Sequence, residues 1–159
     1  MKKNNVFISH YGKDDEHVQS LKERLRSQDF DVRNFSVDST NHKDGRKPTI
    51  AVIERLLKMR IQWSSTFICL IGPKTHTRDW VDFEIGEAYN QSKRIIGVYT
   101  HGSMETAEIP DKLKQCASNI IGWNSIEKIG EIITGKNYPI ENPDSSESSQ
   151  TFDRPNINC

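Results

Sequence analysis

The chain has 159 residues and carries 22 basic and 22 acidic residues, which gives a formal net charge of zero. This length fits one domain of ordinary size, and such a chain needs no metal ion or disulfide to hold a core. Zero net charge argues against a general nucleic-acid-binding protein, because such proteins usually have a basic excess. The sequence has no signal-peptide pattern and no run of about 18 apolar residues that could span a membrane. We therefore expect a cytoplasmic protein with no nucleic-acid or membrane partner.

Short runs of β-branched residues alternate with longer amphipathic segments along the chain. The first strand is expected at 6–9 and the first helix at 14–28, where Val18, Leu21 and Leu25 recur at helical spacing. The later elements are expected in the order strand 30–37, a helix capped by Thr49 and reaching Ile61, strand 65–72, helix 80–91, strand 94–99, a short helical turn after 110, strand 119–123 and helix 125–134.

This alternation predicts an α/β fold with a parallel sheet, right-handed crossovers and helices on both faces. Five strands suggest the flavodoxin-like order 2-1-3-4-5. The strand expected at 65–72 is the most continuously apolar run, as suits a strand covered on both faces. We expect the domain to span 1–135. The rest, 136–159, is expected to be a disordered tail, because 141–155 is rich in serine, proline and acidic residues.

The predicted topology locates a ligand site before any chemistry is considered. Open parallel sheets bind ligands beyond the carboxyl ends of their strands, where the strand order reverses. Here the reversal lies between the first and third strands, next to Ser9-His10-Tyr11 and the segment 72–79, with the loop 38–48 beside them. The strand ends lack the acids of a receiver domain, and no GxxxxGKS/T or GxGxxG phosphate loop occurs.

Two stretches of the sequence resemble a known family. The run 6–10, followed by Asp14 and Asp15, resembles the first box of TIR domains. Trp80 and Glu84, four residues apart on the helix after the third strand, resemble the second box. The resemblance covers roughly residues 5–134 and is closest to the TIR-like proteins of Thoeris-type bacterial anti-phage systems.

The resemblance implies NAD glycohydrolase or ADP-ribosyl cyclase activity, with Glu84 as the catalytic acid. NAD is then the substrate, and no separate cofactor is expected. Thoeris-type members make an ADP-ribose-derived signal that activates a separate effector protein. The resemblance also implies self-assembly through TIR surfaces, but it leaves the product and the trigger open. The product could be ADP-ribose, a cyclised isomer or a conjugate with another small molecule.

Elementary chemistry agrees with a role for one carboxylate. Cleavage of the nicotinamide–ribose bond passes through an oxocarbenium-like transition state, and a carboxylate near the ribose stabilises its positive charge. Around Glu84, the candidate NAD-binding residues are Ser9, His10, Tyr11, Asp38 and Trp80. Aromatic side chains at the switch point can stack on a nicotinamide or adenine ring. The cysteines and histidines lack the spacing of a metal site, so no metal is expected.

Two alternatives remain open. The first is a catalytically silent TIR module that works by assembling with other TIR surfaces, and the presence of Glu84 argues against it. The second is a nucleoside deoxyribosyltransferase, a family with a related fold that uses a glutamate as nucleophile on the sugar. The Ser9-His10 box and the spacing of Trp80 to Glu84 favour a TIR-like enzyme over this alternative.

Overall fold

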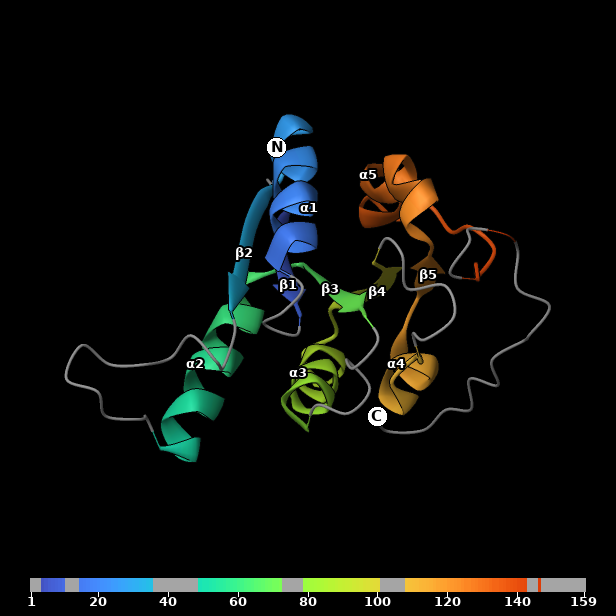
Figure 1. The fold of residues 1–159 in the computed structure, drawn as a ribbon. Coiled ribbons are helices and arrows are strands. Elements are labelled where there is room, and N and C mark those ends of the chain that lie inside the picture. The colour runs from blue at the N-terminus through green and yellow to red at the C-terminus, as the bar shows by residue number, and fades with distance from the viewer. Residues whose placement is uncertain are drawn as a thin grey trace.

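The computed structural model describes residues 4–10, 15–35, 49–72, 79–100, 108–142 and 146. Within these residues the chain forms a parallel sheet with the strand order β2-β1-β3-β4-β5 (Figure 1). The strands are β1 (Asn5–Ser9), β2 (Asp31–Phe35), β3 (Thr66–Ile71), β4 (Arg94–Tyr99) and β5 (Asn119–Ile121). The α/β fold class and the strand order expected from the sequence are confirmed.

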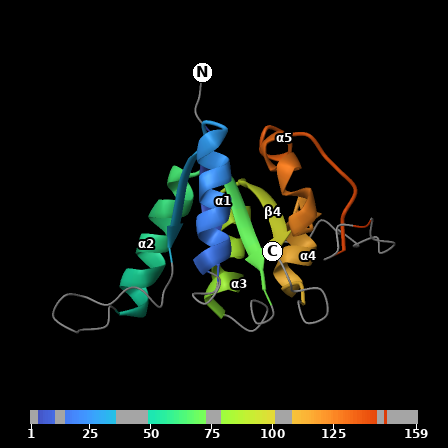
Figure 2. The ribbon, with the colours of Figure 1, turned by 45° about the horizontal axis from the view of Figure 1, so that its top comes forward.

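Helices cover both faces of this sheet. They are α1 (Asp15–Ser27), α2 (Ile50–Trp63), α3 (Asp79–Asn90), α4 (Asp111–Cys116), the 3-10 helix η4 (Trp123–Lys128) and α5 (Ile129–Ile133). Helices α1 and α5 pack on one face, and α2, α3 and α4 pack on the other, as the tilted view in Figure 2 also shows. None of the helices in the described ranges is long and apolar enough to cross a membrane.

The central strands β1 and β3 separate the core into two layers, because successive side chains of a strand point to opposite faces. Phe7 and Phe67 are partners in the register and stack with their ring centroids 5.7 Å apart, on the side of α2 and α3. Ile8 and Ile68 are the next register pair and pack on the side of α1. The same alternation fixes which residues at the strand ends face α3.

Local signals set several helix ends. Thr49 caps α2 as expected, since its side-chain oxygen accepts a hydrogen bond from Val52 N at 3.3 Å. The segment expected as one helix at 125–134 forms η4 and then α5. Its first turn is tighter because Ser125 N donates to Gly122 O, an i to i−3 bond. The loop expected at 38–48, together with the last two residues of the second predicted strand, lies outside the described residues.

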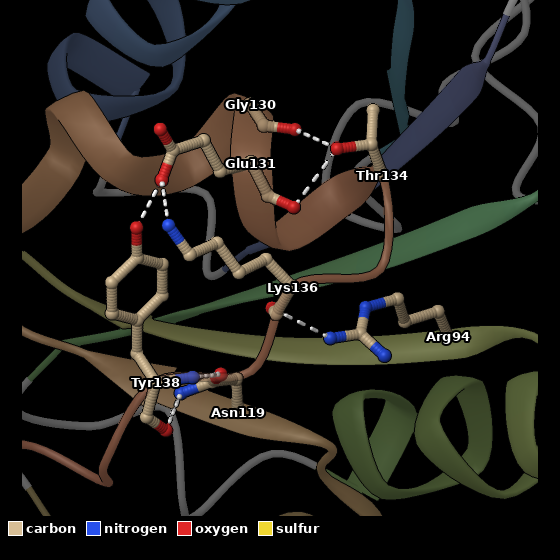
Figure 3. Close-up of polar contacts among 7 residues, drawn as sticks. All are labelled: Arg94, Asn119, Gly130, Glu131, Thr134, Lys136 and Tyr138. Atoms are coloured by element: carbon tan, nitrogen blue, oxygen red, sulfur yellow. Dashed lines mark hydrogen bonds and ion pairs between the residues drawn. The ribbon is translucent and has the colours of Figure 1, made fainter.

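The chain continues to pack against the sheet beyond residue 135. Asn119 of β5 donates its side-chain amide to Tyr138 O at 3.1 Å and accepts from Tyr138 N at 2.9 Å. Figure 3 shows the Tyr138 hydroxyl and the Lys136 ammonium reaching the same carboxylate, that of Glu131 on α5. Arg94 of β4 holds the same segment by donating to Lys136 O at 3.2 Å.

Glu141 completes this anchorage. Its backbone N–H donates to Ile120 O of β5 at 3.0 Å. Its carboxylate is 5% exposed and accepts hydrogen bonds from Gly122 N and Ser125 Oγ, both at 3.0 Å, while Lys128 Nζ lies 3.6 Å away. Packed structure therefore extends at least to Glu141, beyond the domain boundary expected at 135. Most of the remaining residues of the expected tail lie outside the described ranges.

Candidate functional site

Helix α3 carries Glu84 on the side that faces the sheet. Val81, Ile85 and Ala88 of the same helix are buried in the core layer formed with Phe7. Residue 84 lies three after Val81 and four before Ala88, so helical geometry places it on the same inward side. Only 3% of Glu84 is exposed. A carboxyl group therefore sits inside an otherwise apolar layer.

Ser9 lies at the carboxyl end of β1, and none of its surface is exposed. It pairs in the register with Cys69 of β3, and it shares the orientation of Phe7 two residues earlier. Phe7 and Cys69 both belong to the core layer on the α3 side. The Ser9 hydroxyl therefore points toward α3, where it lies beside the carboxyl of Glu84.

Burial dominates the electrostatics of this pair. It raises the pKa of Glu84 to about 8, because an ionised carboxylate loses its hydration inside the apolar layer. The neighbouring Ser9 hydroxyl favours the ionised form and offsets part of that rise. Even so, neither Ser9 Oγ nor Glu84 Oε2 has a hydrogen-bond partner among the described residues. Each of these two atoms therefore has an unused capacity to bond.

Such a carboxyl is suited to chemistry at neutral pH. With a pKa of about 8, Glu84 is largely protonated at pH 7 and can lose its proton when a positive charge approaches. A buried carboxyl with a raised pKa, next to a strand switch point, is a candidate for a functional residue. Its free oxygen can accept a hydrogen bond from a sugar hydroxyl or stabilise a cationic transition state.

The other residues named from the sequence are only partly brought together. His10 follows Ser9 directly and is 6% exposed, so it lies at the same edge of the sheet. Trp80 lies one turn before Glu84 on α3, is half-buried, and contacts Phe83 edge to face at 5.6 Å between ring centroids. Tyr11 and Asp38 lie outside the described residues. The binding of NAD by any of these residues stays a prediction.

One buried polar residue at this edge was not named from the sequence. Thr100 follows the last residue of β4, is almost fully buried, and donates its hydroxyl to Ile71 O at 3.4 Å. The sequence signal that could have identified Thr100 is its position directly after the fourth predicted strand, at the carboxyl edge of the sheet. Among the described residues, no cluster of three or more His, Cys, Asp or Glu side chains could hold a metal ion.

Solved structures of known proteins share the fold. A 2-deoxyribosyltransferase from Bacillus psychrosaccharolyticus is similar at a TM-score of 0.58 and 15% identity, over 77% of this chain and 90% of that one. A prokaryotic SEFIR domain is similar at a TM-score of 0.53 and 16% identity, over 85% of this chain and 94% of that one. At these identities the likeness shows the fold alone. Among curated proteins, no match to this chain was found.

The family is shown by a match in sequence. The family model of the Thoeris protein ThsB, TIR-like domain, matches residues 7–105, which is more than half of the chain. The match includes both ends of the candidate site, Ser9 on β1 and Glu84 on α3. The chain therefore belongs to the TIR-like domain family of the Thoeris protein ThsB.

Proposed function

We propose that this protein is an NAD⁺ hydrolase or ADP-ribosyl cyclase of the TIR type. In this proposal it cleaves the nicotinamide–ribose bond and makes an ADP-ribose-derived signal for anti-phage defence. Membership of the Thoeris family supports the role in defence. The observation that carries the enzymatic part is the buried carboxyl of Glu84 at the carboxyl edge of the sheet, whose Oε2 has no hydrogen-bond partner in the described ranges.

The proposed reaction needs one carboxylate. Departure of nicotinamide leaves positive charge on the ribose, in a transition state with oxocarbenium character. Glu84, once ionised, stabilises that charge and holds a ribose hydroxyl. Nicotinamide leaves as a neutral molecule, so no second carboxylic acid is required to protonate it.

Substrate charge would control the protonation of Glu84. Burial raises the pKa of Glu84 to about 8, which keeps the group mostly neutral at pH 7. The nicotinamide ring of NAD⁺ is positively charged, and a nearby opposite charge lowers the pKa of a carboxyl. Binding of NAD⁺ therefore favours the ionised Glu84 at the place where positive charge moves onto the ribose.

The remaining assignments belong to the same proposal. His10 and Tyr11 stack on a ring of NAD, Ser9 and Asp38 border the ribose, and Trp80 forms an apolar wall beside Glu84. NAD is the substrate, and no further cofactor is proposed. The enzyme works in the cytoplasm, assembles through TIR surfaces, and its product activates a separate effector protein.

Nicotinamide release from NAD tests the proposal. Concentrated wild-type protein and Glu84→Gln are incubated with NAD, and the products are separated by chromatography. Glu87→Gln is the matched control, because Glu87 lies on the same helix but is partly exposed and pairs with Lys58 at 3.7 Å. We expect release by the wild type and the control, and its collapse in Glu84→Gln. The co-product then identifies the reaction.

Other outcomes of this assay favour the alternatives. Equal release by the wild type and Glu84→Gln would show that another residue carries the reaction. No release from concentrated wild-type protein would favour a silent TIR interaction module. Transfer of deoxyribose between two added bases, without NAD cleavage, would identify a deoxyribosyltransferase, whose fold this chain shares.

A further inference from the structure

We propose that Ser9 is a positioning residue for Glu84: its hydroxyl donates a hydrogen bond to the Glu84 carboxylate when that group ionises, and so sets the protonation state in which the site works. This inference concerns the candidate site. Its NMR test is independent of the proposed function, and its kinetic test rests on that function. It departs from the simpler expectation that Ser9 binds the ribose directly.

The geometry of the two side chains carries the inference. Ser9 Oγ and Glu84 Oε2 are both buried, and within the part of the chain that the structure describes both lack a hydrogen-bond partner. Leaving buried polar atoms unpaired is unfavourable, so a site built for stability alone would pair them or replace them with apolar groups. A serine hydroxyl rotates freely about its C–O bond and offers one donor. Ser9 can therefore turn its proton toward the carboxylate without any movement of the backbone.

Few other groups compete for this role among the described residues. The elements packed against α3 carry Glu54, Arg55, Lys58 and Arg60 on α2, Asp111, Lys112 and Lys114 on α4, and Arg94 and Tyr99 on β4, and His10 directly follows Ser9. The carboxylate that Lys58 pairs with is that of Glu87, further along α3. The Lys112 ammonium lies beside Gly86, 3.1 Å from where a Cβ would stand. Of these side chains and Ser9, it is the Ser9 hydroxyl that acts on the carboxyl of Glu84, and it favours the ionised form.

A hydrogen bond to the charged form of an acid lowers its pKa, so removal of the donor should raise the pKa of Glu84. The test is a carbon NMR titration of the full chain labelled at the glutamate carboxyl carbon. The Glu84 signal is identified by its loss in Glu84→Gln. In Ser9→Ala we expect the midpoint of that signal to move up by about one pH unit or more, since a hydrogen bond to a charged group is lost.

Three further variants make the result specific. Ser9→Thr keeps the hydroxyl and should restore the wild-type midpoint, and Ser9→Cys, a weak donor of similar size, should give an intermediate value. The matched control is Ser64→Ala, because Ser64 is equally buried but donates to Ile61 O at 2.7 Å. We expect no change of the Glu84 midpoint in this control. The series also covers the case in which Ser9→Ala fails to fold, since Ser9→Cys and Ser9→Thr then carry the comparison.

Kinetics separate this inference from direct substrate binding. If Ser9 acts on Glu84, the pH profile of NAD cleavage shifts in Ser9→Ala by the same amount as the NMR midpoint. If Ser9 instead binds the ribose, KM rises while both the profile and the midpoint stay in place, which would overturn the inference. An unchanged midpoint in Ser9→Ala would overturn it as well. The NMR arm needs no NAD cleavage, so it stands even if the proposed activity fails.

Discussion

The buried carboxyl of Glu84 makes the stability of this protein depend on pH in a way that one substitution removes. The folded protein holds the Glu84 proton up to a pKa of about 8, whereas the unfolded chain releases it near the ordinary value of 4.5. Between these values the folded state binds more protons than the unfolded state. The free energy of unfolding therefore falls as the pH rises through this window.

The size of this effect follows from the two values. One pH unit of such a difference corresponds to about 1.4 kcal/mol, so the wild type should lose about 3 kcal/mol of unfolding free energy between pH 5 and pH 8 through this group. In Glu84→Gln the side chain keeps its shape but has no proton to lose. We therefore expect the variant to gain about 3 kcal/mol relative to the wild type across the same range.

Urea unfolding at pH 5, 6, 7 and 8 measures the free energy of unfolding of both proteins. The slope m of that free energy against urea concentration should stay constant across the series. The control is Glu23→Gln on α1, where the side chain is exposed and should follow the wild type at every pH. If Glu84→Gln also ran parallel to the wild type, the carboxyl of Glu84 would not be titrating in a buried environment. The electrostatic basis of the candidate site would then be wrong.

Two further predictions concern the packing that supports the site. Glu141→Ala leaves Gly122 N and Ser125 Oγ without their acceptor, so we expect a loss of about 2–3 kcal/mol in urea unfolding, and equal stability of variant and wild type would contradict this anchoring role. Gly97→Ala places a Cβ 3.0 Å from Leu113 Cδ2 between β4 and α4, so we expect thermal unfolding to show a loss of about 1–3 kcal/mol in the free energy of unfolding. An unchanged melting temperature would contradict this prediction.

That Ser9 and Glu84 lie in one region could be predicted from the sequence, because this depends on topology. Ser9 ends an apolar run and Glu84 lies on the helix that follows another, so the pairing of β1 with β3 brings their neighbourhoods together. What the linear pattern did not give is the burial of Glu84, because that depends on the rotation of α3 about its axis. The spacing of Val81, Ile85 and Ala88 was the available signal, and it puts Glu84 on the inward side.

Residues 136–141 show the opposite case, in which local composition does not reveal the contacts that form. A stretch rich in polar and acidic residues predicts disorder when each residue is considered alone. Here the acid at 141 is a buried acceptor whose donors, Gly122 and Ser125, lie in a different element, and the asparagine at 119 binds the backbone of Tyr138. These pairings join positions far apart in the chain, so no local pattern could reveal them.

The contrast between Glu141 and Glu84 separates structural from functional acids in this fold. Both carboxyls are almost fully buried, at 5% and 3% exposure. Glu141 accepts two hydrogen bonds and lies 3.6 Å from the Lys128 ammonium, so its burial is compensated within the protein. Among the residues that the structure describes, Glu84 Oε2 has no hydrogen-bond partner, and the Ser9 hydroxyl alone offsets the burial of the carboxyl. The contrast with Glu141 agrees with the proposal that a substrate completes the site at Glu84.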